Sequence, residues 1–110
     1  MKQGDIIWVD FDPTKGREQA GHRTAVVISR TLYNKKRSLA LVCPITSQTR
    51  LLRFHVQLDE RTKTKGDVIC EQIKVIDLLV HKCKVIEQMP KDLLRQVLEA
   101  VTSIISYETQ

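Results

Sequence analysis

The sequence predicts a mainly β protein, a small and strongly curved antiparallel sheet or partly open barrel with one C-terminal helix packed against it. Two observations support this. The first two thirds of the chain consist of short apolar segments separated by polar turns, and the closing segment repeats apolar residues at helical spacing. Because the chain has 110 residues, we expect one compact domain spanning residues 1–110.

Five strands are expected first along the chain. The earliest alternates from Asp5 and ends at the turn signal Asp12-Pro13. The second and third are almost entirely apolar, which predicts burial of both faces, whereas the fourth alternates again. The expected strands are residues 5–11, 24–29, 38–43, 53–58 and 67–73, and residues 74–79 and 83–86 are two further strand-like segments. The polar connections, at 14–22, 33–37, 44–50 and 59–66, are expected to be loops or turns.

One amphipathic helix is expected between Pro90 and Tyr107. Pro90 suits the first turn of a helix, and Asp92 complements the positive N-terminal end of the helix dipole. One face is expected to pack into the core, or otherwise against a second copy of the chain. That face carries Leu94, Leu98, Val101 and Ile105.

The positive charge lies in the middle of the chain. Eighteen Lys and Arg against thirteen Asp and Glu give a net charge of +5. Residues 13–65 contain twelve basic and three acidic residues, a net +9, whereas residues 1–12 and 66–110 each carry −2. This distribution predicts a basic surface suited to a polyanion.

The expected compartment is the cytoplasm. No apolar run reaches the ~20 residues that cross a bilayer, and the first residues lack the basic and apolar regions of a signal peptide. Cys43, Cys70 and Cys83 are odd in number and widely spaced, which favours reduced thiols over a disulfide framework or a zinc site. We therefore expect no contact with a membrane.

No cofactor and no metal are expected, because the sequence has no glycine-rich phosphate loop, no His-Glu-x-x-His motif and no cysteines at metal-binding spacing. The segment with Arg17, Glu18, His22 and Arg23 could bind phosphate, although a solvated loop of mixed charge is the more common arrangement. Metal-free RNA cleavage needs a base for the 2′-hydroxyl, stabilisation of phosphorane charge and a proton for the leaving oxygen. Arg, Glu, His and Thr side chains can supply these functions.

Residues 4–23, GDIIWVDFDPTKGREQAGHR, closely resemble the N-terminal signature of the MazF/PemK family of bacterial toxins. The resemblance continues, in the family's order and approximate spacing, through residues 25–29, 33–34, 42–47, 54–56 and 71–73 to 76–77. It implies a CcdB/PemK-like fold, a curved sheet with SH3-like barrel character plus helices. It also implies a homodimeric, metal-independent endoribonuclease toxin that cleaves single-stranded mRNA at selected sequences and is silenced by a cognate antitoxin.

The resemblance also indicates site residues. The family's central Arg and Thr fall on Arg23 and Thr46, and a glutamate proposed to take part in some members falls on Glu18. Because arginine keeps its proton, Arg23 is better described as a phosphate anchor and transition-state clamp than as a base. The residues expected to bind RNA are Gln19, His22, Ser47, Gln48, Arg50, Arg53 and His81.

The sequence departs from the family pattern at two positions. Thr24 replaces the proline after the central arginine, which is expected to change loop stiffness more than chemistry. His81 or Lys82 stands where a basic residue, usually arginine, contacts RNA in the family. The resemblance therefore places this RNA contact only approximately in the sequence.

Two non-catalytic alternatives share the predicted fold. One is a CcdB-like gyrase poison, but those toxins act through a C-terminal Trp-Gly-Ile, whereas this sequence ends in residues 106–110, SYETQ. The other is an RNA-binding module, which would need exposed aromatic side chains for stacking. Trp8 lies in an expected strand, and a core or interface position is more common for a tryptophan there than stacking on a base.

The basic run at residues 35–37 is equally compatible with RNA contact and with a solvated turn.

Overall fold

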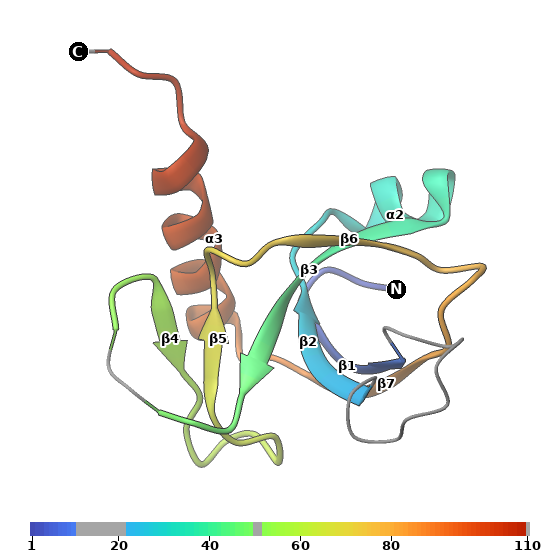
Figure 1. Ribbon diagram of the computed structural model, residues 1–110, viewed down its shortest axis with the longest axis horizontal. Coiled ribbons are helices and arrows are strands. Elements are labelled where there is room, and N and C mark those ends of the chain that lie inside the picture. Colours follow the sequence, from blue (N-terminus) through green and yellow to red (C-terminus); the bar gives the residue numbers. More distant parts are fainter. Residues whose placement is uncertain (11–21, 50–51, 110) are drawn as a thin grey trace.

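The structure, a computed structural model, describes residues 1–10, 22–49 and 52–109, with only the backbone of His22. Within these residues, seven strands form an antiparallel sheet that does not close into a barrel, with two helices beside it (Figure 1). The elements are β1 (Asp5–Asp10), β2 (His22–Val27), α2 (Thr31–Arg37), β3 (Leu39–Thr46), β4 (His55–Gln57), β5 (Asp67–Ile69), β6 (Lys74–Asp77), β7 (Cys83–Gln88) and α3 (Lys91–Ile105). The predicted class, a curved antiparallel sheet with a C-terminal helix, is confirmed, and the open edge distinguishes it from a closed barrel.

Strand β3 is shared by three partners. The strand order is β4-β5-β3-β2-β1-β7, and β6 pairs separately with β3. One edge of β3 pairs with β2, from Val27↔Val42 to Thr24↔Ile45. The other edge pairs first with β6, over residues 39–42, and then with β5, over residues 45–46. Both β5 and β6 run antiparallel to β3, and the chain between them turns as it follows the curved strand (Figure 1).

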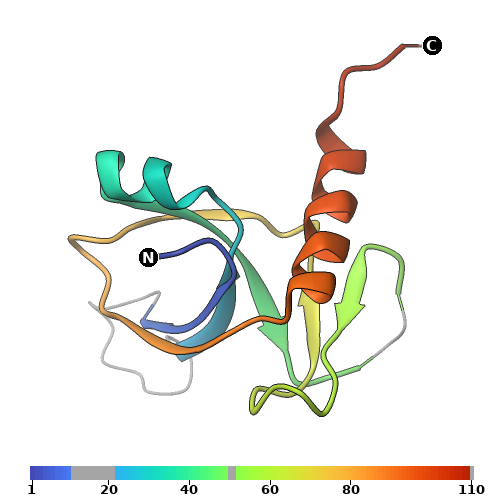
Figure 2. The ribbon, with the colours of Figure 1, turned by 180° about the vertical axis from the view of Figure 1, so that it is seen from behind.

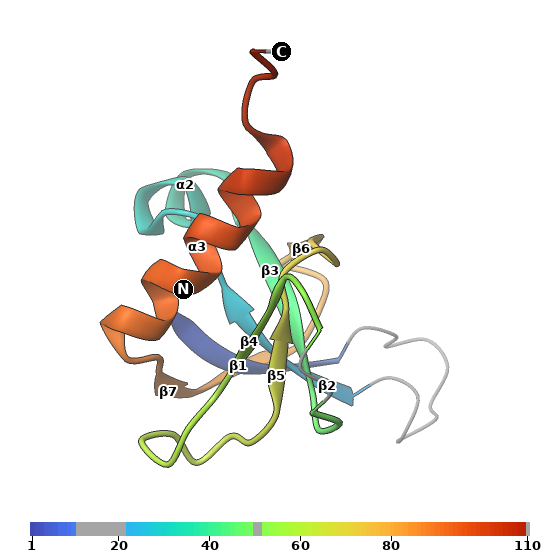
Figure 3. The same cartoon turned by 90° about the vertical axis from the view of Figure 1, so that its left-hand side faces the viewer.

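Both faces of the central strands are buried, as their continuous apolar runs predict. Successive side chains of a strand point to opposite faces, so Ile6 and Val26 belong to one apolar cluster and Ile7 and Val27 to the other. The first cluster also contains Leu93, Val97 and Val101 of α3, which covers that side of the sheet (Figures 2 and 3). The second cluster is smaller and lies on the opposite side.

Helix α2 replaces the loop expected over residues 33–37, so that prediction is wrong. Local periodicity could not reveal this helix because it buries only one residue, Asn34. Asn34 Nδ2 donates to the carbonyl oxygens of Met1 at 3.1 Å and Ser29 at 3.3 Å. Met1 is distant from Asn34 in the sequence, and the spacing between Ser29 and Asn34 matches no helical or strand period. The basic residues 35–37 form the last helical turn, where cations complement the negative end of the dipole.

Helix α3 confirms the expected C-terminal helix but is shorter than residues 90–107. Its buried residues are Leu93, Val97 and Val101, and Leu94 and Leu98 pack against them half-buried. The expected core position of Ile105 is wrong, because its side chain is 69% exposed. The reason is geometric: the last turns of α3 extend past the sheet (Figure 1).

The cysteines are all free, as predicted. Burial is the main cause that raises the pKa of Cys43 to about 12, and the nearby Cys70 adds to the effect. Burial, with a smaller effect of Glu71, raises the pKa of Cys70 to about 11. Burial also raises the pKa of Cys83. The thiolate is the reactive form of cysteine, so the raised pKa values keep these three thiols protonated and less reactive.

No helix in the described part of the chain is long and apolar enough to cross a membrane.

Gly66 allows β5 to start beside β3. Its φ is +122°, and a Cβ atom at this position would lie 1.9 Å from the carbonyl oxygen of Thr46. Its own carbonyl accepts the N–H of Leu58 at 2.9 Å. Only a residue without a side chain fits both the backbone conformation and this close approach.

Gly66→Ala is therefore expected to destabilise the protein by about 2 kcal/mol or more, because φ above zero and a backbone clash combine. Gly4→Ala is the matched control. It also has a positive φ, +92°, but its nearest obstacle is the movable Gln88 side chain at 2.7 Å, so its cost should be smaller. Urea unfolding of both variants measures the difference, and equal losses would contradict this account.

Candidate active site

Arg23 and Thr46 reach the same face of the sheet from neighbouring strands. Thr24 pairs with Ile45, so Arg23 and Thr46 stand at the next position of the β2–β3 ladder. Side chains alternate along a strand, and Arg23 therefore continues the face of Ala25 and Val27 beyond the end of the apolar cluster. The register of two buried strands thus determines where both polar side chains lie.

These two side chains line a hollow with a volume of about 490 Å³, here called the basic hollow. The rest of its polar lining comes from Lys65, which precedes β5, and from Gln72 and Lys74, which lie just before and at the start of β6. It also includes Thr24 and Ser47, which follow Arg23 and Thr46 directly in the sequence. The full lining is Arg23, Thr24, Pro44, Ile45, Thr46, Ser47, Lys65, Ile69, Gln72 and Lys74.

The basic hollow carries three cations, Arg23, Lys65 and Lys74, and none of its lining residues, all in the described part of the chain, is acidic. Lys65 Nζ donates to the Thr62 carbonyl oxygen at 3.4 Å. Three cations on one concave surface attract an anion more strongly than they would apart. A guanidinium can also donate two parallel hydrogen bonds to phosphate oxygens. The hollow is therefore suited to a phosphate group.

The hydroxyl of Thr46 is oriented by the backbone that follows it. The N–H of Gln48 donates to Thr46 Oγ1 at 3.2 Å. A hydroxyl accepts through its lone pairs and still has one proton to donate. This contact lets the half-buried Thr46 present its O–H proton as a donor while the oxygen is held in place.

A second hollow of about 270 Å³, here called the His55 hollow, adjoins the first. The two share Thr46, Ile69 and Gln72. The remaining lining of the His55 hollow is Gln48, Leu52, His55 and Glu71. His55 Nδ1 lies 3.4 Å from Oδ2 of Asp67, which is 1% exposed and pairs in register with Thr46. The two hollows form a continuous surface across β3, β5 and β4.

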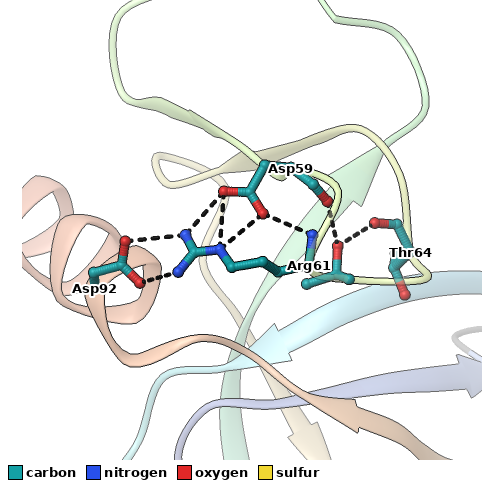
Figure 4. A network of polar contacts seen from close by, with 5 residues as sticks. Asp59, Arg61, Thr64 and Asp92 are labelled. Atoms are coloured by element: carbon teal, nitrogen blue, oxygen red, sulfur yellow. Dashed lines mark hydrogen bonds and ion pairs between the residues drawn. The ribbon is translucent and has the colours of Figure 1, made fainter.

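The loop that carries Lys65 is fastened to α3 through Arg61. Arg61 Nη1 and Nη2 donate to the carboxylate of Asp92 at 2.9 and 3.0 Å, and its Nη2 also donates to Asp59 at 2.8 Å (Figure 4). The hydrogen bonds from Arg61 lower the pKa of both Asp92 and Asp59. Arg61 and Asp92 are exposed and Asp59 is half-buried at the surface, so these ion pairs position the loop and add little to the stability of the fold.

Glu87 of β7 holds the same loop a few residues further along. Its carboxylate accepts the backbone N–H groups of Lys63 at 3.0 Å and Thr64 at 2.8 Å, and the Thr64 hydroxyl at 2.8 Å. Burial by itself would raise the pKa of Glu87, but these hydrogen bonds outweigh it and lower the pKa. Lys65 and Gly66 follow directly, so the edge of the basic hollow is held from β7.

The structure brings together only part of the predicted site. Arg23, Thr46 and Ser47 line the basic hollow, and Gln48 lines the His55 hollow. Arg53 lies 5.7 Å from the ring centre of Phe54 and lines neither, and His81 is held by the Asp10 carbonyl oxygen, 2.9 Å from its Nδ1, and also lines neither. Glu18, Gln19 and Arg50 lie outside the described residues, as does the side chain of His22. The catalytic and RNA-binding functions assigned to these residues stay predictions.

Sequence reasoning missed several residues of the two hollows. Lys65, Lys74, Gln72 and His55 line the hollows, and Asp67 lies behind His55, but no spacing in the sequence links any of them to Arg23 or Thr46. The available signals were two family-like segments, residues 54–56, which contain His55, and residues 71–73, which contain Gln72 and directly precede Lys74. The described residues contain no group of three or more His, Cys, Asp or Glu side chains that could hold a metal ion.

Comparison with known proteins identifies the family. The sequence profile of the PemK-like, MazF-like toxin of type II toxin–antitoxin systems matches residues 2–105. The chain belongs to this family. The resemblance seen in the sequence is thereby confirmed.

Individual MazF-like proteins support this assignment. The endoribonuclease toxin MazF of Escherichia coli strain K12 is 49% identical over 73 residues, covering 66% of this chain and 65%, slightly under two thirds, of that protein. The endoribonuclease PemK of Escherichia coli is 33% identical over 110 residues, covering 96% of this chain and 83% of that one. A MazE–MazF crystal structure from Deinococcus radiodurans matches with a TM-score of 0.87 and 26% identity, covering 98% of each chain.

The loop anchor of this MazF-like protein predicts an acid-dependent stability. Glu87 and Asp92 have lowered pKa values when folded, against usual values of 4.5 and 3.8. The contribution of these carboxylates to the free energy of unfolding is therefore complete above their pKa values in the unfolded chain. It is lost as the pH falls below about 4.5 and through their lower pKa values in the folded protein. We expect Glu87→Gln to lower the melting temperature at pH 7 and to flatten its decrease between pH 5 and 3. Circular dichroism melts check this against Glu99→Gln, an exposed α3 control, and parallel pH curves for both variants would contradict it.

Proposed function

We propose that this MazF-like protein is a metal-independent endoribonuclease toxin that cleaves single-stranded mRNA at selected sequences. The observation that carries the proposal is the meeting of Arg23 and Thr46 in one hollow with Lys65 and Lys74. The relatives MazF and PemK of Escherichia coli are named endoribonucleases, which supports it.

In the proposed reaction the 2′-oxygen attacks the adjacent phosphorus and the bond to the 5′-oxygen breaks. The products are a 2′,3′-cyclic phosphate and a 5′-hydroxyl. The base takes the proton of the 2′-hydroxyl, and the departing 5′-oxygen takes one from solvent, so protons balance. Arg23 clamps the phosphorane oxygens through its guanidinium, Thr46 donates its O–H to one of them, and Glu18 is the proposed base. Each donor acts more strongly as negative charge grows in the transition state.

The proposed partners are a cognate antitoxin and a second copy of this chain. The Deinococcus radiodurans MazF structure, which this fold matches, contains MazE. An acidic antitoxin segment would be complementary to the three cations of the basic hollow and would compete there with RNA. We further propose that the 110 residues act as one toxin domain in the cytoplasm, where mRNA is available.

Arg23→Ala and Thr46→Val are expected to reduce cleavage of a single-stranded RNA by about 100-fold or more, because each removes a donor to the developing charge. Thr46→Val keeps the side-chain shape and removes the hydroxyl. The assay follows a labelled oligonucleotide by gel electrophoresis in EDTA, and melting temperatures confirm that both variants fold. A substrate with 2′-deoxyribose at the cleaved nucleotide should remain intact.

Two outcomes would contradict the proposal: intact RNA with the unmodified protein, or equal cleavage by Arg23→Ala. Cleavage abolished by EDTA would contradict the metal-independent reaction specifically. If RNA stays intact, DNA gyrase inhibition by the same preparation tests the CcdB-like alternative.

Lys65→Ala and Lys74→Ala should each weaken RNA binding and lower its salt dependence. For single strands, the slope of log affinity against log salt falls by about 0.7 for each phosphate contact that is lost. Lys84→Ala on β7, an exposed lysine that lines neither hollow, is the matched control. Fluorescence anisotropy of an uncleavable 2′-O-methyl oligonucleotide measures the slopes, and equal slopes for all three variants would contradict a phosphate contact in the basic hollow.

A further inference from the structure

We infer that the His55 hollow is a nucleobase subsite, in which His55 and Glu71 recognise a base that carries an exocyclic amino group. This inference rests on the proposed function and extends it. RNA clamped by its phosphate in the basic hollow has to place a neighbouring nucleotide on one side, and the adjoining His55 hollow shares Thr46, Ile69 and Gln72 with it.

The two hollows differ in chemistry. The basic hollow has three cations, whereas the His55 hollow is lined by one carboxylate, one imidazole, two amides, one hydroxyl and two aliphatic side chains. Glu71 would repel a phosphate, so this second hollow suits the uncharged part of a nucleotide. Leu52 and Ile69 offer apolar contact to a flat ring, and the polar groups can meet its edge. Its volume of about 270 Å³ is that of a small pocket.

The buried Asp67 determines which ring nitrogen of His55 is available to a ligand. Oδ2 of Asp67 lies 3.4 Å from Nδ1 of His55. A carboxylate oxygen accepts, so Nδ1 is the nitrogen that carries the proton, and Nε2 is the nitrogen left for a ligand. Asp67 is itself held by strand pairing on both sides, with Thr46 of β3 and Gln57 of β4. The orientation of His55 is therefore linked to the position of Thr46.

The acceptors in this hollow favour particular bases. With its proton on Nδ1, the His55 ring offers Nε2 as an acceptor, and the Glu71 carboxylate offers only acceptors. Adenine, cytosine and guanine carry an exocyclic amino group that donates to such groups. Uracil has a single N–H, which lies between two carbonyl oxygens. These oxygens would face the Glu71 carboxylate. We therefore expect discrimination against uracil at one position of the RNA.

The test measures kcat/KM on oligonucleotides in which each base around the cleavage site is varied in turn. At one position the unmodified protein should prefer an amino-bearing base over uracil by about tenfold or more, the scale of one good base contact. Glu71→Gln, His55→Ala and Asp67→Asn should each reduce that preference at this position alone. Glu99→Gln, the exposed α3 control, should keep it.

Replacing the preferred base by its analogue without the amino group, such as inosine for guanine or purine riboside for adenine, should reproduce the loss with the unmodified protein. The same replacement should have little further effect in Glu71→Gln. Glu71 is exposed, so this arm does not depend on a buried substitution, and melting temperatures identify any variant that fails to fold.

Unchanged base preferences in Glu71→Gln and in every folded variant, or a preference for uracil at the affected position, would overturn the inference and leave the ribonuclease proposal intact. If the unmodified protein cleaves no RNA, the proposed function fails separately. The subsite is then decided by the affinities of uncleavable 2′-O-methyl oligonucleotides, which should show the same base preference and lose it in Glu71→Gln. Equal affinities for all bases would overturn it.

Discussion

Strand β3 is the constraint on which the rest of the structure depends. Its eight residues pair with β2 on one edge and with β6 and then β5 on the other. This sharing works only if the chain approaches very closely at Gly66, where a side chain would meet the backbone of Thr46. The same approach places Asp67 beside Thr46. Packing and site geometry therefore depend on one short ladder.

The proposed site residues lie at the end of a well-packed β ladder rather than within it. Arg23 and Thr46 extend faces whose earlier positions, such as Ala25 and Val42, are completely buried. Rigid neighbours reduce the reorganisation needed when charge develops on a phosphate. The loop before Lys65 is held by Glu87 of β7. The same loop is held by α3 through the contact between Arg61 and Asp92 (Figure 4).

The two adjoining hollows differ in chemistry in a way that suits the proposed sequence-selective ribonuclease. Cations bind phosphate without regard to sequence, whereas base selection needs donors and acceptors of defined orientation. Asp67 stands between the two, paired with Thr46 on one side and within reach of His55 on the other. Asp67 therefore connects the base subsite inferred at the His55 hollow with the phosphate site proposed at Thr46.

The sequence by itself predicted the sheet, its C-terminal helix and the family, because these depend on local periodicity and on short motifs of consecutive residues, and it indicated Arg23 and Thr46 as candidate site residues. It could not reveal α2, whose Asn34 finds its partner at Met1, nor the exposure of Ile105, which depends on where the sheet ends. Only the tertiary structure placed Lys65, Lys74, His55 and Asp67 around Thr46. The physical reason is that strand pairing joins residues far apart in the chain, and no local pattern records which strands become neighbours.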